Sequence, residues 1–177
     1  EAATVALDAA VAGLAVAGSA TSDAGLLAVI TVDGTVVFLS LPALELLAEH
    51  PGAVAASSDG APVEVPAIAW LADGARWHLA AVTSHGPGVV LSNVSIENFD
   101  LSALRLQAFD ASTRLHQVAG AAFVPSVVEF SPYTLAVAGM PLDGGCGDSI
   151  VLWAIGGPEE KLVAVDGLSL PGGGIPR

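Results

Sequence analysis

Residues 124–155, VPSVVEFSPYTLAVAGMPLDGGCGDSIVLWAI, contain the pattern from which the architecture of the chain can be predicted. A Ser131-Pro132 pair and a break rich in glycine and aspartate separate three apolar runs. Short apolar runs bounded by such turn residues are typical of buried β-strands, and their close spacing favours antiparallel neighbours. The segment therefore predicts three antiparallel strands of one sheet.

An approximate internal repeat extends this pattern along the chain. LAVI (residues 27–30), LAAV (79–82) and LAVA (135–138) recur at intervals of 52 and 56 residues. A glycine-containing turn and another apolar run follow each of them, and such a period with three or four strands per unit is typical of a β-propeller. We therefore expect an all-β fold of about three four-stranded antiparallel blades of a partial β-propeller. The blade-like units span about residues 1–60, 61–120 and 121–177.

Two segments of the first unit carry local predictions. Asp33-Gly34 lies between two β-branched runs and predicts a tight hairpin turn. Residues 40–50 (SLPALELLAEH) leave two alternatives. Ser40 as a cap and the good helix formers after it suit a short helix. In a blade the same segment is the outer strand, which we favour because tertiary context overrides helix propensity.

Three blades do not close a ring, because closed propellers need about four to eight. Other blades of the same protein or another chain are therefore expected to complete it. An open stack would otherwise leave large apolar faces in water.

Composition and charge restrict the classes of partner. The chain has 177 residues, of which 53% are hydrophobic and 13% charged, and 18 acidic residues against 5 basic ones give a formal net charge of −13. Such a surface repels phosphate backbones, so we expect no direct nucleic-acid binding. The single cysteine, Cys146, excludes an internal disulfide and suits a reducing, intracellular compartment. Acidic residues interrupt every long apolar stretch, so no membrane insertion is expected.

No motif for catalysis, metal or cofactor binding is present. The four histidines are scattered, whereas a zinc site needs several convergent ligands. The DGGCGD loop at residues 143–148 lacks both the closing glutamate of a calcium loop and the lysine of a phosphate loop. No Gly-x-Ser-x-Gly elbow surrounds Ser84-His85 or Ser131. We therefore expect a protein that is not an enzyme and has no cofactor.

Contacts with protein partners are predicted in the loops and on one or two tryptophan side chains. Glycines in the 143–148 loop would let a partner's backbone approach closely. The three tryptophans are expected to pack in the blade cores, with one or two of them at a binding hot spot. The candidate partner-binding residues are Asp143, Gly144, Gly145, Asp148, His85 and Trp77.

The third unit resembles a WD40 repeat. The resemblance rests on Phe130-Ser131-Pro132, on LAVAG at residues 135–139 and on IVLW at 150–153. Ala154 stands where the family usually has aspartate. The resemblance implies a propeller that acts as a scaffold for protein–protein interaction.

The first unit resembles the late blades of the cytoplasmic-face nucleoporin propeller. The similar segments are GTVV at residues 34–37, LPALE at 41–45, VEV at 63–65 and Trp70-Leu71. That family has a seven-bladed domain at the nuclear pore complex, where it docks a DEAD-box RNA helicase during mRNA export. The resemblance implies a non-catalytic scaffold at the nuclear pore complex or in the cytoplasm, with a DEAD-box RNA helicase or other pore subunits as partners.

Two alternatives and one disfavoured class remain. SLPAL at residues 40–44 also resembles the lethal giant larvae and tomosyn family, whose propellers are scaffolds of exocytosis and polarity. A structural half-propeller completed by another subunit is the second alternative. A propeller enzyme is disfavoured because its site would need charged side chains converging from the inner strands, and these positions are nearly all Ala, Val, Leu or Ile.

Overall fold

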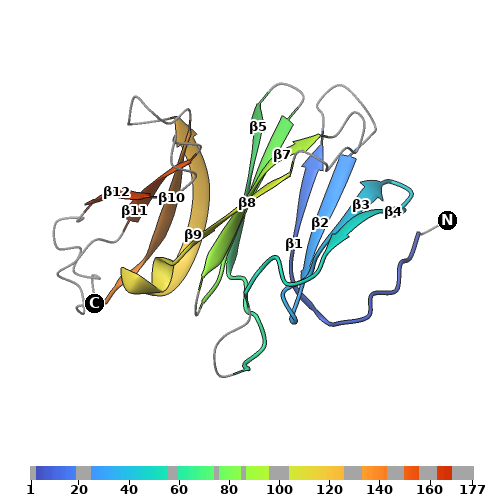
Figure 1. Cartoon of the computed structure of the whole chain (residues 1–177), viewed down its shortest axis with the longest axis horizontal. Coiled ribbons are helices and arrows are strands. Elements are labelled where there is room, and N and C mark those ends of the chain that lie inside the picture. The colour runs from blue at the N-terminus through green and yellow to red at the C-terminus, as the bar shows by residue number, and fades with distance from the viewer. Residues whose placement is uncertain are drawn as a thin grey trace, which may run out of the picture.

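The protein is built almost entirely of β-strands, arranged as three four-stranded antiparallel sheets that lie face to face (Figure 1). A computed structural model of the chain describes residues 3–18, 25–55, 60–73, 76–84, 87–95, 104–125, 133–142, 150–155 and 163–168. Each sheet is formed by four consecutive strands in sequence order. The predicted all-β class with three four-stranded, blade-like sheets is therefore confirmed, and the described sheets form an open array, not a closed ring.

The strands follow one another along the chain as four per sheet. Sheet A consists of β1 (Val11–Gly18), β2 (Gly25–Thr31), β3 (Val36–Leu41) and β4 (Leu46–His50). Sheet B consists of β5 (Ala67–Asp73), β6 (Arg76–Val82), β7 (Gly88–Ser95) and β8 (Arg105–Phe109). A short 3₁₀ helix, η1 (Ala111–Thr113), leads into sheet C. Sheet C consists of β9 (Leu115–Pro125), β10 (Tyr133–Pro141), β11 (Ile150–Ile155) and β12 (Val163–Leu168).

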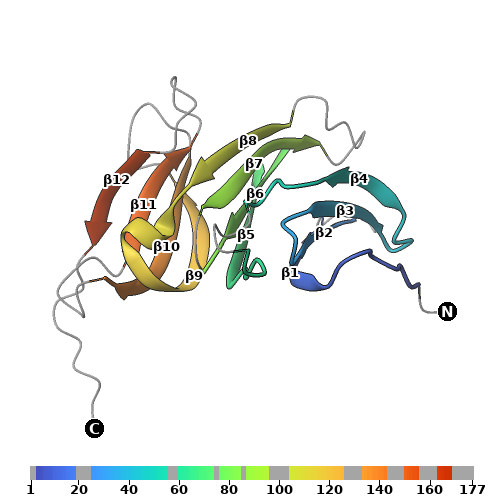
Figure 2. The same ribbon diagram turned by 60° about the horizontal axis from the view of Figure 1, so that its bottom comes forward.

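The first strands of the three sheets lie along one side of the array. In Figure 2, β1, β5 and β9 occupy its lower side, and β4 and β8 its upper side. Strand β5 contacts both β1 and β9. This arrangement is compatible with blades of a propeller, in which the first strands would be the inner ones, and the side with β1, β5 and β9 is therefore called the axial side.

Residues 40–50 form a turn and a strand, so the helical alternative for this segment is wrong. The Ser40 amide donates to the Glu45 carbonyl at 2.9 Å, and the Leu44 amide donates to the Ser40 carbonyl at 2.8 Å. These bonds close a turn after the cis Leu41-Pro42 peptide bond, and β4 then pairs antiparallel with β3. Pairing satisfies the β3 edge and packs Leu47 and Ala48 against the core, which outweighs helix propensity.

The third sheet begins earlier than the predicted boundary at residue 121. Strand β9 starts at Leu115 and pairs with β10. The break before it is η1, where the Asp110 carboxylate accepts from the Ser112 amide at 2.9 Å. The apolar run predicted at residues 124–130 coincides with β9 only at its end, and residues 126–132 lie outside the described part of the chain.

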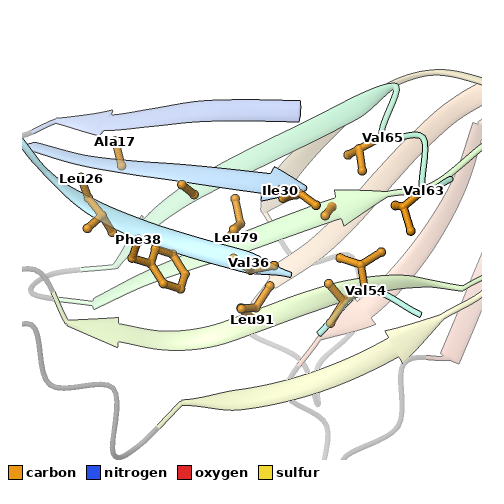
Figure 3. Close-up of a cluster of buried hydrophobic side chains, with 13 residues drawn as sticks. Ala17, Leu26, Ile30, Val36, Phe38, Val54, Val63, Val65, Leu79 and Leu91 are labelled. Carbon is orange, nitrogen blue, oxygen red and sulfur yellow. The ribbon is translucent and has the colours of Figure 1, made fainter. Parts of the chain in front are cut away.

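Two clusters of buried side chains hold the three sheets together. The first lies between sheets A and B, where Leu26, Ile30 and Phe38 meet Leu79 and Leu91 (Figure 3). Residues of the connector between the two sheets complete it: Val54, Val63 and Val65. The second cluster lies between sheets B and C, and its members are Ala67, Ala69, Ala80, Val82, Val90, Phe109, Ala111, Leu115, Leu135, Val137, Val151 and Trp153.

The repeated LAVI, LAAV and LAVA segments are in register in the folded chain. They form parts of β2, β6 and β10, each the second strand of its sheet. Each sheet has a preceding-side face, which is turned toward the earlier part of the array, and a following-side face. The repeat leucines Leu27, Leu79 and Leu135 lie on preceding-side faces, and the alanines Ala28, Ala80 and Ala136 lie on following-side faces. The sequence repeat therefore corresponds to a repeat of sheet packing.

The described residues contain no helix that could span a lipid bilayer.

Candidate interaction surfaces

Of the six residues predicted to contact a partner, the structure describes one. His85, Asp143, Gly144, Gly145 and Asp148 lie outside the described residues. Trp77 lies on β6, half-buried, and the centroid of its ring is 5.9 Å from that of Trp70, with an interplanar angle of 89°. Both rings pack against the cluster between sheets A and B. Trp77 thus contributes an edge-to-face aromatic pair to the core, and part of its ring is left for contact at the surface.

The innermost strands carry few ionisable side chains. Strand β1 (VAGLAVAG) has none, β5 (AIAWLAD) has Asp73 alone, and β9 (LHQVAGAAFVP) has His116 alone. Since β1, β5 and β9 lie on the axial side of the array, the described part of this side presents mainly small and apolar groups. Such a surface offers packing area but few groups for acid–base chemistry.

Polar groups gather on this side at a cavity of about 310 Å³ at the junction of sheets B and C. Its lining comes from the connector before β5, the second residue after β6 and the start of β9: Glu64, Ser84, His116, Gln117 and Val118. The backbone closes it, because the Ser84 amide donates to the Glu64 carbonyl at 3.0 Å. Sequence analysis did not identify this group, since its members are far apart along the chain and no motif joins them.

Three of the four polar side chains of this cavity, Glu64, Ser84 and His116, are not arranged as a catalytic triad. A serine nucleophile needs a hydrogen-bonded base, which a third group in turn orients. Within the described part of the chain, no hydrogen bond joins the side chains of Ser84, His116 and Glu64. The arrangement therefore suits recognition of a polar group better than covalent catalysis.

A second hollow, of about 160 Å³, lies on the outer, preceding-side face of sheet A. The segment before β1 crosses this face, and Leu7 packs against Val29, Val37 and Leu39. The carboxylates of Asp8, Asp33 and Glu49 lie around the apolar floor of the hollow. Like charges gathered in this way favour a cationic group over an anionic one.

Asp33 is held in its ionised form by the turn to which it belongs. The Thr31 hydroxyl donates to its Oδ1, and the Thr35 amide donates to the same oxygen at 3.2 Å. The Thr31 bond, followed by the Thr35 bond, lowers the pKa of Asp33 below its usual value.

This pKa shift predicts a pH-dependent effect of Asp33→Asn. A carboxyl whose pKa is lower in the folded than in the unfolded state stabilises the fold above its unfolded pKa, and that stability is lost as the pH falls through the folded pKa. The wild type should therefore melt at a higher temperature than Asp33→Asn at neutral pH, and the difference should shrink below about pH 4. Thermal unfolding of both proteins between neutral and acidic pH measures this. A difference that is constant or grows on acidification would contradict the role given to the turn.

Each end of the array exposes part of an apolar sheet face, although on sheet A the central residues Val29, Val37 and Leu39 are buried beneath Leu7 and Leu44. On the preceding-side face of sheet A, Leu14 and Val16 are 61% and 58% exposed. On the following-side face of sheet C, Ala136, Ala138 and Leu152 are only half-buried. Both faces lie outside the two core clusters that join the sheets.

Comparison of the chain with models of known protein families and with curated protein sequences found no match.

Proposed function

We propose that the protein is a non-catalytic scaffold for protein–protein interaction, built as part of a β-propeller. The observation that carries this proposal is the axial side of the array. Propeller enzymes need charged side chains converging there from several inner strands. In this chain the inner strands supply small and apolar residues, with His116 of β9 in the cavity that it shares with Glu64 and Ser84. Binding through loops that a rigid sheet array positions is the function that remains.

For the partner, the resemblance of the first unit supports a nucleoporin-like scaffold of mRNA export that binds a DEAD-box RNA helicase. The strong negative charge of the chain, −13, suits a basic protein surface. A scaffold of the lethal giant larvae and tomosyn type, which serves exocytosis and polarity, is the alternative that residues 40–44 support. Both alternatives place the contacts in loops such as residues 143–148.

Direct binding of purified partners tests the proposal. The whole chain is immobilised, and a DEAD-box RNA helicase of the export type and proteins of membrane fusion are passed over it. We expect saturable binding of the helicase that weakens as salt rises, because complementary charges are screened. Binding of the fusion proteins alone would favour the alternative family, and binding of neither class would contradict both readings.

A pair of charge variants separates a local contact from a general effect of net charge. Asp143→Asn combined with Asp148→Asn removes two charges from the predicted binding loop. Glu45→Gln combined with Glu97→Gln removes two charges elsewhere in the chain. If the 143–148 loop contacts the partner, only the first pair should weaken binding, by roughly tenfold for about 1.4 kcal/mol of lost contact. Equal losses in both pairs would remove this loop from the proposed interface.

A further inference from the structure

The preceding-side face of sheet A carries the same kinds of side chain as the preceding-side faces of sheets B and C, which are each covered by another sheet. Leu79 and Ala81 of sheet B lie on the equivalent face and are buried against sheet A. Leu135 and Val137 of sheet C are buried in the same way against sheet B. In sheet A the equivalent residues are Leu27 and Val29. No earlier sheet of the described chain packs on them: Leu7 of the segment before β1 covers Val29, and Leu14 and Val16 of β1 on the same face are exposed.

The outer face of sheet C is the complement of that surface. On the following-side face of each sheet, the repeat segment places an alanine: Ala28, Ala80 and Ala136. Inside the chain, the face with Ala28 packs against the face with Leu79, and the face with Ala80 packs against the face with Leu135. At both sheet contacts the repeat alanine of one face and the repeat leucine of the other therefore belong to one buried cluster, together with larger residues such as Leu26 and Phe38. Ala136 is left without a leucine-bearing face opposite it.

The inner strands repeat the same complementarity at one position. In sheet A, a Cβ atom built on Gly13 would lie 3.0 Å from Cδ1 of Ile68 and 3.3 Å from Cβ of Val65, so β5 closely approaches this glycine. Gly13 pairs with Ile30, and in sheet C Gly120 pairs with Ala138, which is the equivalent residue. A Cβ atom on Gly120 would meet nothing within 4 Å. Within the described part of the chain, Gly120 is thus the same small site without an occupant.

The residue equivalent to Ile68 in sheet A is Leu14. Ile68 pairs with Ala81, and Leu14 pairs with Val29, the residue equivalent to Ala81. Leu14 is 61% exposed. One end of the array therefore exposes a large side chain, and the other end exposes the small site into which its counterpart fits inside the chain.

We propose that two copies of this chain associate through these end faces, with sheet A of each copy packed on sheet C of the other. Leu14 of one copy then seats over Gly120 of its partner, as Ile68 seats over Gly13 within the chain. The two contacts join two arrays of three sheets into one ring of six, which lies within the range of about four to eight blades for closed propellers. Pairing of two A faces with each other would leave both C faces uncovered.

The buried area suits a stable dimer. A sheet of four strands, about 20 Å long and about 4.8 Å apart, presents a face of roughly 400 Å². Four such faces bury roughly 1,600 Å², the size of an ordinary specific interface. The segment before β1 lies within this contact. Leu7 packs on Val29, Val37 and Leu39 of sheet A, and Val63 of the connector before β5 is likewise buried between sheets A and B.

Analytical ultracentrifugation of the whole chain tests the proposal. We expect a species of twice the 17.5 kDa mass of one chain, with no larger species at higher concentration. Because each copy carries a net charge of −13, the dimer should become tighter as salt screens the repulsion. A single-chain mass at all concentrations, or open-ended polymers that grow with concentration, would overturn the ring.

Exchange of the two complementary side chains tests the contact itself. Gly120→Leu fills the small site and should weaken the dimer by roughly 100-fold or more, because it overpacks both contacts. It should leave the circular dichroism spectrum unchanged, since the added side chain points into open space in one chain. Leu14→Ala combined with Gly120→Leu should restore the dimer, because a large side chain again faces a small one.

A Gly120→Leu variant that dimerises like the wild type would overturn the proposed contact. So would a dimer that Leu14→Ala disrupts and Gly120→Leu does not, which would indicate pairing of two A faces. These results do not depend on the proposed scaffold function, because ultracentrifugation measures the mass of the species that the purified chain forms without any binding partner.

Discussion

Replacement of Leu79 by alanine is expected to destabilise the protein by about 2–5 kcal/mol, enough to unfold a large share of a typical domain. Leu79 lies on β6 with 0% of its side chain exposed, in the cluster between sheets A and B. Truncation removes its burial and leaves a cavity between two sheets whose backbones cannot collapse around it. Urea denaturation followed by circular dichroism measures the loss of unfolding free energy.

The internal repeat supplies a matched control for this variant. Leu27 has the same place in sheet A, but its face is at the end of the array and its side chain is only half-buried. Leu27→Ala should therefore lower the free energy of unfolding by only about 1 kcal/mol, measured at protein concentrations too low for association. Equal losses for Leu27→Ala and Leu79→Ala would contradict the assignment of an outer face to Leu27.

Replacement of Gly34 by alanine is expected to be comparably damaging, for a reason of backbone geometry. Gly34 has φ of 85°, a conformation that L residues rarely adopt, and a Cβ atom there would lie 2.0 Å from the carbonyl oxygen of Val54. The backbone at Val54 is held close to Gly34 because the Val54 amide donates to the Gly34 carbonyl at 3.0 Å. The added methyl group must displace the connector from the core, so we expect a loss of at least about 3 kcal/mol.

Gly52 is the control that separates the effect of the positive φ from the effect of the clash with Val54. Its φ is 64°, and a Cβ atom on it would meet nothing within 4 Å. Gly52→Ala therefore carries the conformational penalty alone, about 1 kcal/mol. Chemical denaturation of both variants gives the comparison. A Gly34→Ala protein as stable as Gly52→Ala would show that the connector does not press against the turn.

Much of the fold could be predicted from local pattern. Asp33-Gly34 forms the predicted turn between β2 and β3, because a positive φ is available to glycine and the Asp33 carboxylate binds the turn. The three LAVI-like segments are predicted to be equivalent strands because each is a continuous apolar run, as a strand buried on both faces requires. The start of β9 at Leu115 was missed, since the signal there is a 3₁₀ turn capped by Asp110, not glycine or proline.

Less of the candidate site could be predicted. The loop at residues 143–148 was proposed from composition alone, and Trp77 from its residue type. The cavity of Glu64, Ser84 and His116 left no trace in the sequence. A cavity between two sheets depends on which strand ends the fold brings together, and sequence spacing does not encode that.

Strand number, the antiparallel meander and the three-unit repeat follow from the order of apolar runs and turn residues, because a pleated strand alternates its faces with a period of two. Which of those faces is covered could be learned only from the folded chain. Leu27 and Leu79 are equivalent in sequence, yet one lies at an open end and the other between two sheets. Burial depends on neighbours that arrive from distant parts of the chain, and a local pattern carries no record of whether a neighbour is there.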